Sequence, residues 1–410
     1  MSSPADEALP LAGVRVIDYS HFLAGPHLSR CLAAMGADVI KVERPKEGDA
    51  GRAHGYFKDG QSGYFLQQNM GKRGLCVDLK DPRGKALMLD LVKTADVFVE
   101  NYRPGALARL GLGYEALSTL NPGLVYCSVS AYGHTGPDAA RPGFGLIAEA
   151  RSGALAMLGE EGRPPPLLRM PLADMYTGVH GVGAVCAALF GRVRSGRGRH
   201  IDLALYDCMV SMHDYAVQRF FMSGETEIPR RTGAQAPDSP IYGVFPGADG
   251  YLVVAAQVDD AWSRLAALIG GAATEPRFAT PEGRAAHFED AARLVTDWTA
   301  AQPSVAACLA ALDAAGVPCA RVQTIDQVVA DPQIAARGMI VEQDHPVLGP
   351  VKLPNLPFRF SDCDTSPRRV APLLGQHNAE IARSLGRNEA EIAAMRRDGV
   401  LYAEPAARPG

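Results

Sequence analysis

The first third of the chain alternates apolar strand patterns with helical patterns, and this alternation restricts the fold more than any other feature. The segments typical of buried strands are GVRVIDYS, ADVIKVERP, GLCVDLK, ADVFVEN and LVYCSVSAYG. Helical patterns separate them, namely PHLSRCLAAMG, DPRGKALMLDLVKTA and a short helix around Tyr114 to Leu120. Strands and helices that alternate at this spacing predict a parallel sheet with helices on its faces. We therefore expect an α/β fold whose large domain is Rossmann-like and doubly wound.

One helix start in this region is marked by the dipeptide Asp81-Pro82. An Asp before a helix accepts hydrogen bonds from the unpaired N–H groups of the first turn, and Pro suits the first helical position. The sequence therefore predicts a helix that begins at Pro82.

Later segments predict a second, smaller domain. The stretch HIDLALYDCMVSMHDYAVQRFFMSG predicts a strand or turn that leads into a long helix. YGVFPGADGYLVVAAQ is typical of a β-hairpin with its turn at Gly247 to Gly250, and helical runs and the strand PCARVQ follow it. We expect the first part of the large domain at residues 1–224, a polar linker at 225–241, a small α+β domain at 242–331, a second linker at 332–356 and a helical C-terminal part at 357–410.

Composition is ordinary for a soluble enzyme. The chain has 410 residues, of which 47% are hydrophobic, enough for a sizeable core in two domains. The formal net charge is -4 and the pI is about 6.2. Because this balance provides no basic field, we expect no nucleic-acid partner.

No segment indicates export, membrane insertion or metal binding. The N-terminal sequence MSSPADEALPLAG lacks the basic start and apolar run of a signal peptide. The longest uncharged apolar stretch, Val179 to Phe190, is shorter than the ~20 residues of a membrane span. The eight cysteines are scattered, without metal-ligand spacing. We expect a cytoplasmic protein with reduced thiols, no metal site and no membrane contact.

The end of the second strand suggests a ligand with a phosphorylated ribose. Parallel sheets bind nucleotide-like ligands at the carboxyl ends of their strands, where Glu43 could hold a ribose hydroxyl and Arg44 a phosphate on that ribose. The dinucleotide fingerprint G-x-G-x-x-G is missing, since HFLAGPHLSR after the first strand has a single glycine. NADP and coenzyme A (CoA) both carry a ribose phosphate, so the charge pattern does not choose between them.

Other polar residues follow strand ends or helix starts. Asn101 and Tyr102 come directly after the strand ADVFVE, where they could contact a ligand or form a turn with Pro104 and Gly105. Taken singly, each cation in such a position is interpreted as a solvated charge, as is Arg44; these cations are Lys72, Arg73, Lys80, Arg103, Arg109 and Arg141.

A lone acid, Asp174 in PLADMYTG, stands before the apolar segment MYTGVHGVGAVCAALFG. An Asp at such a place is often an N-cap, whose side chain satisfies N–H groups of the first turn. A carboxylate there could also carry chemistry, and the residues alone leave both interpretations open.

Long blocks of the chain resemble the class III CoA-transferases, the formyl-CoA:oxalate transferase type. The blocks are DYSHFLAGPHLSRCLAAMGADVIKVERPKEGD, GKRGLCVDLKDPRGK, ADVFVENYRPGALARLGLGYEAL, SAYGHTGPDAARPGFGLIAEARSG, SGRGRHIDLALYD, AGVPCARVQTIDQVVADPQIAARGM and APLLGQHN. They cover nearly the whole chain in order. The resemblance implies a large domain completed by the C-terminal part, a small domain, and an interlaced homodimer in which each chain threads through the other.

The resemblance also implies the site. Asp174 matches the family's nucleophile, which forms a mixed anhydride with the acyl group and then a CoA thioester. CoA and acyl-CoA are substrates, and no tightly bound cofactor is implied. The helix dipole would keep Asp174 ionised. Positions that match CoA contacts of the family are Arg44, Val77, Lys80, Asn101, Tyr102, Arg109 and Arg141.

Two departures from the formyl-CoA type argue against oxalate as the acceptor. Leu23 stands where that type has a glutamine beside the reaction centre, and the shielding glycine-rich loop has no counterpart before YGVFPGADG. We expect CoA transfer from an acyl-CoA, such as succinyl-CoA or another short-chain acyl-CoA, to a small carboxylic acid. A dicarboxylate such as succinate or a C4 to C6 relative is the first expectation for one substrate.

Three other functions are alternatives to CoA transfer. An α-methylacyl-CoA racemase has the same fold but places a His in the block RPGFG, where this chain has Phe144. A non-catalytic acyl-CoA binding protein has no need of Asp174. An NADP oxidoreductase is disfavoured by the missing glycine fingerprint.

Overall fold

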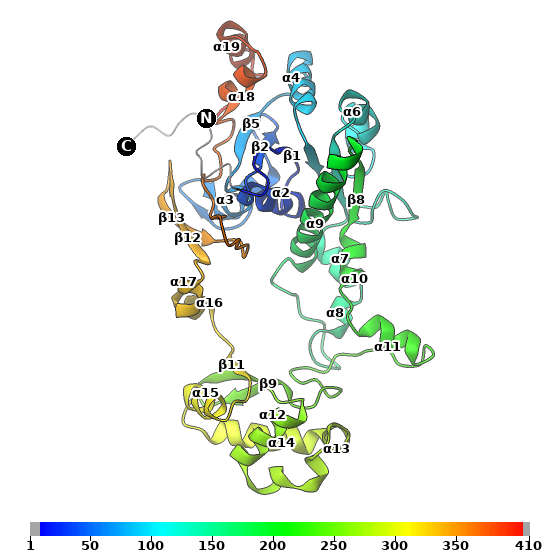
Figure 1. Ribbon diagram of the computed structural model, residues 1–410, viewed down its shortest axis with the longest axis vertical. Coiled ribbons are helices and arrows are strands. Elements are labelled where there is room, and N and C mark those ends of the chain that lie inside the picture. Colours follow the sequence, from blue (N-terminus) through cyan, green and yellow to red (C-terminus); the bar gives the residue numbers. More distant parts are fainter. Residues whose placement is uncertain (1–8, 405–410) are drawn as a thin grey trace. The chain divides into compact units, whose positions relative to one another are not determined.

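The structure, a computed structural model, describes residues 9–404 (Figure 1). The chain forms two compact units. The first unit contains residues 1–152, 168–213 and 332–410, and the second contains residues 153–167 and 214–331.

A six-stranded sheet forms the centre of the first unit, and every neighbouring pair of its strands is parallel. The strands are β1 (Arg15–Tyr19), β2 (Asp38–Glu43), β5 (Arg73–Cys76), β6 (Val97–Glu100), β7 (Val125–Ser130) and β8 (His200–Ala204). Their order across the sheet is β5-β2-β1-β6-β7-β8. Counted within this sheet, that is 3-2-1-4-5-6, the order of the doubly wound dinucleotide-binding sheet. The α/β class expected from the sequence is confirmed.

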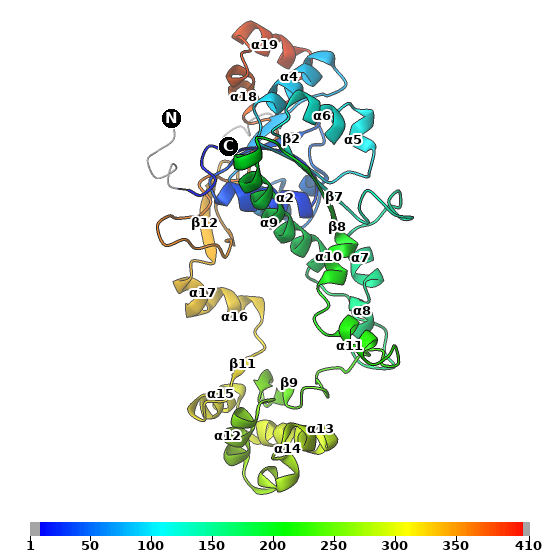
Figure 2. The same ribbon diagram turned by 45° about the vertical axis from the view of Figure 1, so that its right-hand side comes forward.

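Helices cover both faces of this sheet (Figure 2). On one face α2 (Ala24–Ala34) packs beside the long helix α9 (Leu172–Ser195). A buried apolar cluster joins the sheet to the helices on the opposite face, which are α4 (Pro82–Lys93), α6 (Tyr114–Leu120), α18 (Asn378–Ser384) and α19 (Glu389–Arg397). The start of α4 is as predicted, because Asp81 is its N-cap and accepts a hydrogen bond from the Arg83 N–H.

Shorter elements complete the first unit. Before β5 lie the 3-10 helix η1 (Ala50–Ala53), the small hairpin β3 (Phe57–Lys58) and β4 (Gln61–Ser62), and α3 (Gly63–Asn69). After β6 come α5 (Ala106–Arg109), α7 (Gly145–Arg151) and α10 (Leu205–Ser211). The segment 332–356, expected to be a linker, holds α17 (Pro332–Ala336) and the hairpin of β12 (Ile340–His345) with β13 (Gly349–Pro354).

The second unit has its own core. An antiparallel sheet, ordered β11-β10-β9, consists of β9 (Tyr242–Gly247), β10 (Gly250–Ala255) and β11 (Cys319–Arg321), so the predicted hairpin is confirmed. Its apolar side chains cluster with those of α12 (Asp259–Ile269), α14 (Phe288–Ala301) and α15 (Val305–Ala314). The remaining elements are α8 (Ala154–Met157), α11 (Ala216–Met222), η2 (Gly271–Thr274), η3 (Pro276–Phe278), α13 (Pro281–Ala286) and α16 (Ile325–Ala330).

One expectation about a helix was wrong. The long helix predicted after β8 is two helices, α10 and α11, with a break at Met212 to Tyr215. The chain passes from the first unit to the second at this break, between His213 and Asp214. Helix α9 extends beyond the uncharged apolar stretch Val179 to Phe190 at both ends. Within residues 9–404 it is the one helix whose length and apolar composition would allow it to cross a membrane, and a core helix can pass the same test.

Candidate active site

The order of the sheet locates the crevice. Strand order reverses between β1 and β6, and ligands of such sheets bind beyond the carboxyl ends of the strands at that point. A cavity of about 170 Å³ opens there. It is lined by Tyr19, Ser20, His21, Phe22, Val42, Glu43, Arg44, Gly48, Asp49, Ala50 and Tyr102. The charged end of β2 and the aromatic residues after β1 and β6 therefore share one site.

Asn101 ties the two strand ends together. Its side-chain amide donates to the His21 carbonyl at 2.7 Å, and its carbonyl oxygen accepts from the His21 N–H at 2.8 Å. The Tyr102 ring lies 5.2 Å from that of Tyr19 and 4.8 Å from that of His21, measured between centroids. Asn101 thus orients the loop after β1, a contact within the chain that the sequence did not reveal.

The other residues predicted to contact CoA follow strands of this sheet in the sequence and differ in their surroundings. Arg44 lines the cavity and forms an exposed ion pair with Glu47 at 2.8 Å. Val77 is buried in the core just after β5. Lys80, Arg109 and Arg141 are exposed and do not line this cavity, although each follows the carboxyl end of a strand. Arg141 pairs with Asp138 at 2.9 Å.

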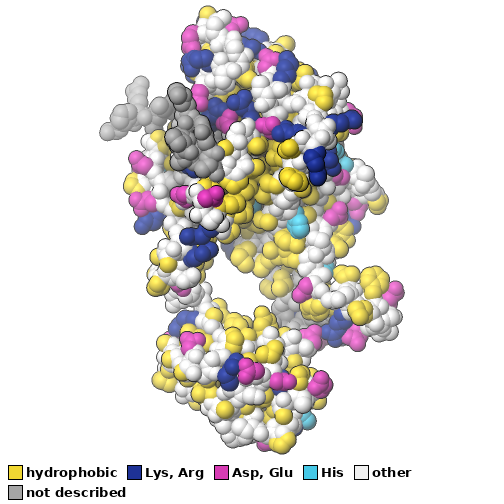
Figure 3. Space-filling model, viewed as in Figure 1, with side chains coloured by type: hydrophobic (Ala, Val, Ile, Leu, Met, Phe, Trp, Pro, Cys, Tyr) yellow, Lys and Arg dark blue, Asp and Glu magenta, His cyan; other side chains and the backbone are white. Residues whose placement is uncertain are grey.

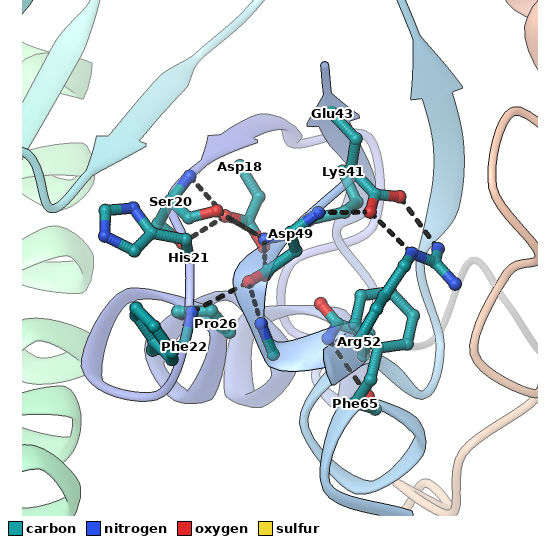
Figure 4. A network of polar contacts seen from close by, with 12 residues as sticks. Asp18, Ser20, His21, Phe22, Pro26, Lys41, Glu43, Asp49, Arg52 and Phe65 are labelled. Carbon is teal, nitrogen blue, oxygen red and sulfur yellow. Dashed lines mark hydrogen bonds and ion pairs between the residues drawn. The ribbon is translucent and has the colours of Figure 1, made fainter. Parts of the chain in front are cut away.

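A network of buried charges lies beneath the loop after β1 (Figure 4). The Lys41 ammonium lies 2.7 Å from the Asp49 carboxylate and 3.7 Å from that of Asp18, and Lys72 donates to Asp18 at 2.8 Å. Burial alone would raise the pKa of Asp18, but Lys41 and Lys72 outweigh it and lower the pKa. Burial lowers the pKa of Lys72 to about 8, although Asp18 opposes the shift. The interpretation of Lys72 as a solvated charge was therefore wrong, because its side chain is fully buried and paired.

This network fixes a strained residue. Phe22 has a φ of 62°, in the left-handed region that residues other than glycine rarely adopt. Its N–H donates to the Asp49 carboxylate at 2.9 Å, and the Lys41 ammonium donates to the Ser20 carbonyl at 2.5 Å. The Phe22 ring meets the edge of the Phe144 ring with 6.1 Å between centroids. The buried charges thus hold an aromatic side chain toward the start of α7.

Asp174 lies close to the first residue of α7. It is the third residue of α9, whose N-cap is Pro171 and lacks a side-chain hydrogen bond, so Asp174 is not the N-cap. One of its carboxylate oxygens approaches Gly145, the first residue of α7, so closely that a Cβ on Gly145 would lie 2.2 Å from that oxygen. Any larger residue at position 145 would force this carboxylate to move.

The ionisation of Asp174 is shifted in the direction opposite to that of Asp18. Burial, together with the carboxylate of Glu149, raises the pKa of Asp174 from 3.8 to about 6. Burial also raises the pKa of Tyr64 in α3, and the charge of Asp174 adds to that shift. The helix dipole, expected to keep Asp174 ionised, is opposed here by burial and by a second acid, which both raise the pKa.

The sequence reasoning missed Gly145, Glu149 and Tyr64. The signal for Glu149 was weak but present, since an acid inside the helical run GLIAEARSG has to be paired or placed at a site when that helix is buried. Gly145 is the last residue of RPGFG, a block in which only Phe144 was considered for a role.

Residues 11–378 match the description "CoA-transferase family III". The chain belongs to this family. It is 38% identical over 392 residues to a succinate–glutarate CoA-transferase of Agrobacterium fabrum, covering 92% of this chain and 96% of that protein. It is 32% identical to a formyl-CoA:oxalate CoA-transferase of Streptomyces avermitilis, covering 95% and 99% of the two chains. A crystal structure of a CAIB/BAIF family protein from Brucella suis has 36% sequence identity and a TM-score of 0.82, and the match covers 92% of this chain and 99% of that one.

These matches confirm the resemblance seen in the sequence. The protein is an enzyme, a family III CoA-transferase that moves CoA between an acyl-CoA and a carboxylate. CoA thioesters are therefore its substrates. The racemase, binding-protein and NADP alternatives are not favoured.

Proposed function

We propose that this family III CoA-transferase moves CoA from succinyl-CoA, or another short-chain acyl-CoA, to a small dicarboxylate, with Asp174 as the covalent nucleophile. The observation that carries the proposal is the half-buried Asp174 carboxylate, whose pKa is raised to about 6 and whose oxygen fits against Gly145. A succinate–glutarate CoA-transferase is among the similar proteins, which supports a dicarboxylate of four to six carbons.

The proposed reaction exchanges acyl groups without water or redox chemistry. A carboxylate oxygen of Asp174 attacks the thioester carbonyl carbon, the C–S bond breaks, and the CoA thiolate leaves with the electron pair. The thiolate then attacks the aspartyl carbonyl of the mixed anhydride, which releases the donor carboxylate and leaves an aspartyl-CoA thioester. The acceptor carboxylate repeats these steps in reverse order and leaves as its CoA thioester. Anhydride and thioester are both activated acyl groups, so covalent catalysis divides one exchange into nearly balanced steps.

The proposed CoA site is the carboxyl edge of the sheet. Arg44, Lys80 and Arg141 would meet phosphates, since charge-assisted contacts to phosphate are the strong ones. Asn101 and Tyr102 would shape the crevice, Val77 would pack beneath it, and Arg109 would act from α5. The aromatic pair of Phe22 and Phe144 would help to exclude water from the intermediates.

We further propose a Rossmann-like large domain in an interlaced homodimer. Hydrophobic side chains are visible over much of the face shown in Figure 3. In α9, Val179, Phe190 and Val193 are exposed by 50%, 68% and 83%, and their spacing places them on one stripe of the helix. Such a stripe suits an interface between two copies. Light scattering should give the mass of a dimer, and Val193→Glu should shift it toward monomer. A cytoplasmic location and the absence of nucleic-acid and membrane partners stay predictions.

The test of the proposed mechanism is a covalent adduct. Incubation with succinyl-CoA alone should place CoA on the peptide that contains PLADMYTG, and hydroxylamine should discharge it. Asp174→Asn is the matched variant, since it keeps the shape and loses the nucleophile. It should fold, form no adduct and lose at least about four orders of magnitude in turnover, because no carboxylate remains to attack the thioester. A folded Asn variant with near-normal turnover would rule Asp174 out, and an acyl-CoA bound without any turnover in the wild type would favour the binding-protein alternative.

A further inference from the structure

Glu149 is a buried acid that the reaction scheme does not use. It lies in α7, and its side chain is 3% exposed. One carboxylate oxygen accepts a hydrogen bond from the Ala173 N–H at 3.2 Å. Ala173 is the second residue of α9, where N–H groups have no partner within the helix. Glu149 therefore satisfies a donor of the first turn that Pro171, the N-cap, cannot satisfy.

The contact places two acids side by side. Ala173 is adjacent to Asp174 in the chain, and the carboxylate of Glu149 raises the pKa of Asp174. Within residues 9–404, neither acid forms an ion pair with a Lys, Arg or His side chain, in contrast to the acids of the network under β1. A neutral acceptor such as Gln would satisfy the Ala173 N–H equally well. This hydrogen bond therefore does not require Glu149 to be charged.

Groups on the neighbouring elements do not neutralise the pair. Helix α2 presents His27 to Gly178, one turn beyond Asp174, and burial lowers the pKa of His27 to about 4, which keeps the ring neutral. Helix α3 contributes Tyr64, whose pKa is raised. Helix α10 carries Asp207, whose pKa is raised by burial and by Asp202. Each of these groups is neutral or an acid.

We propose that Glu149 is a positioning residue whose negative charge, held beside Asp174 by the hydrogen bond to α9, drives acyl transfer onto Asp174. This inference rests on the proposed role of Asp174. When the Asp174 oxygen bonds to the thioester carbonyl carbon and the C–S bond breaks, the negative charge leaves with the CoA thiolate. The repulsion between the two carboxylates ends in that step, so the charge of Glu149 favours the covalent intermediates over the free enzyme.

A quantitative relation follows from this scheme. Binding a proton and accepting an acyl group both remove the charge of Asp174. The repulsion by Glu149 therefore favours both changes to the same extent, and a shift of one pKa unit equals a tenfold change in an equilibrium. Replacing Glu149 should lower the ratio of covalent adduct to free enzyme by the same factor as it raises the acid dissociation constant of Asp174, read from the acidic limb of the rate profile.

The experiment compares Glu149→Gln with the wild type. Gln keeps the acceptor for the Ala173 N–H and removes the charge. Burial contributes more than Glu149 to the shift of Asp174, so we expect the acidic limb of kcat/KM to move down by about 0.5–1 pH unit. The adduct ratio at fixed succinyl-CoA and succinate should fall about three- to tenfold, measured by intact mass. Glu115→Gln, an exposed acid in α6, is the matched control and should change neither quantity.

Glu149→Asp separates charge from shape. It keeps the negative charge but shortens the side chain. Its adduct ratio should therefore stay within about twofold of the wild-type ratio, and the acidic limb of its kcat/KM profile within about 0.3 pH unit of the wild-type limb. This variant decides the question by itself should Gln fail to fold. A loss of adduct in the Asp variant as large as that expected for Gln would overturn the proposal, as would unchanged values in a folded Gln variant. In either case the wild type would still form its adduct, whereas failure of the Asp174 mechanism would abolish the adduct in every variant.

Discussion

Two pairs of acids in the first unit have opposite surroundings. Asp18 and Asp49 are enclosed with Lys41 and Lys72, and the pKa of each acid is lowered because the cations outweigh the effect of burial. Asp174 is enclosed beside Glu149 without an ion-pair partner in residues 9–404, and its pKa is raised. An acid enclosed with a cation stays in its charged form, and the ion pair holds the surrounding backbone in place. An acid enclosed beside another acid is ready to lose its charge, which suits a covalent nucleophile.

The largest effect that this comparison predicts is on stability. Asp18→Asn leaves Lys72 buried without its carboxylate, and breaking a buried pair in this way costs about 3–5 kcal/mol. Asp174→Asn should instead leave the free energy of unfolding at pH 7 unchanged or raise it, because it removes a charge that burial disfavours. Urea unfolding of both variants measures the contrast. An Asp18→Asn variant within about 1 kcal/mol of the wild type would contradict the distinction.

The sign of the pH dependence sharpens this contrast. The folded-state pKa of Asp18 is lowered, so its contribution to stability is present above the unfolded pKa and is lost as the pH falls through the acid range. The folded-state pKa of Asp174 is raised, so its contribution is present below its unfolded pKa and is lost as the pH rises through about 6.

A smaller effect is expected from crowding the nucleophile. Gly145→Ala places a Cβ 2.2 Å from the present position of an Asp174 oxygen, which must move. A displacement of about 1 Å at a reacting group can cost about 100-fold in kcat. Stability should change little, because only the end of the Asp174 side chain has to move. Gly191→Ala in α9, where the added Cβ meets its nearest neighbour at 3.5 Å, is the control and should keep normal kcat.

The strands of the sheet could be predicted from the sequence, whereas the pairing of the charged residues around the site could not. Strands β1, β2, β5, β6 and β7 each show in a short apolar run, and the start of α4 shows in Asp81-Pro82, because these signals are local. The sequence pattern singled out Asp174, and the resemblance supplied its role as nucleophile, but neither revealed its surroundings. The helix break before Asp214 was missed because it depends on the chain leaving one unit for the other.

The ion pairs and the second acid depend on residues far apart in the chain. Asp18 and Lys72 are separated by 54 positions, and Glu149 and Ala173 by 24. A lysine inside the strand run ADVIKVERP was a usable hint, since a buried cation requires an acid nearby. Which acid it meets, and whether a second acid lies without a cation, follows only from the packing of α2, α7 and α9 against the sheet.

The loss of kcat/KM at low pH is the next prediction, and its expected size is moderate. Attack requires the Asp174 carboxylate in its charged form, so kcat/KM should fall about tenfold per pH unit once the pH drops below about 6. An aspartate paired as Asp18 is would show no such limb above pH 4. A profile measured between pH 4.5 and 8, with stability checked at each pH, decides between the two. A rate that stays constant down to pH 4.5 would contradict the raised pKa.

The smallest expected effect concerns a cation that the fold leaves at the surface. Arg44 lines the crevice, but its side chain is 64% exposed and its guanidinium is already paired with Glu47, unlike the enclosed Lys41 and Lys72. A contact from Arg44 to the ribose phosphate of CoA therefore replaces solvent and Glu47, and should contribute at the low end of charge-assisted contacts. Arg44→Ala should raise the Kd for CoA about three- to tenfold in calorimetry, with unchanged stability. Dephospho-CoA, which lacks that phosphate, should bind the wild type and the variant equally. If the variant weakens both ligands to the same extent, Arg44 acts on another part of CoA, and the ribose phosphate has to be held by one of the exposed cations Lys80, Arg109 or Arg141.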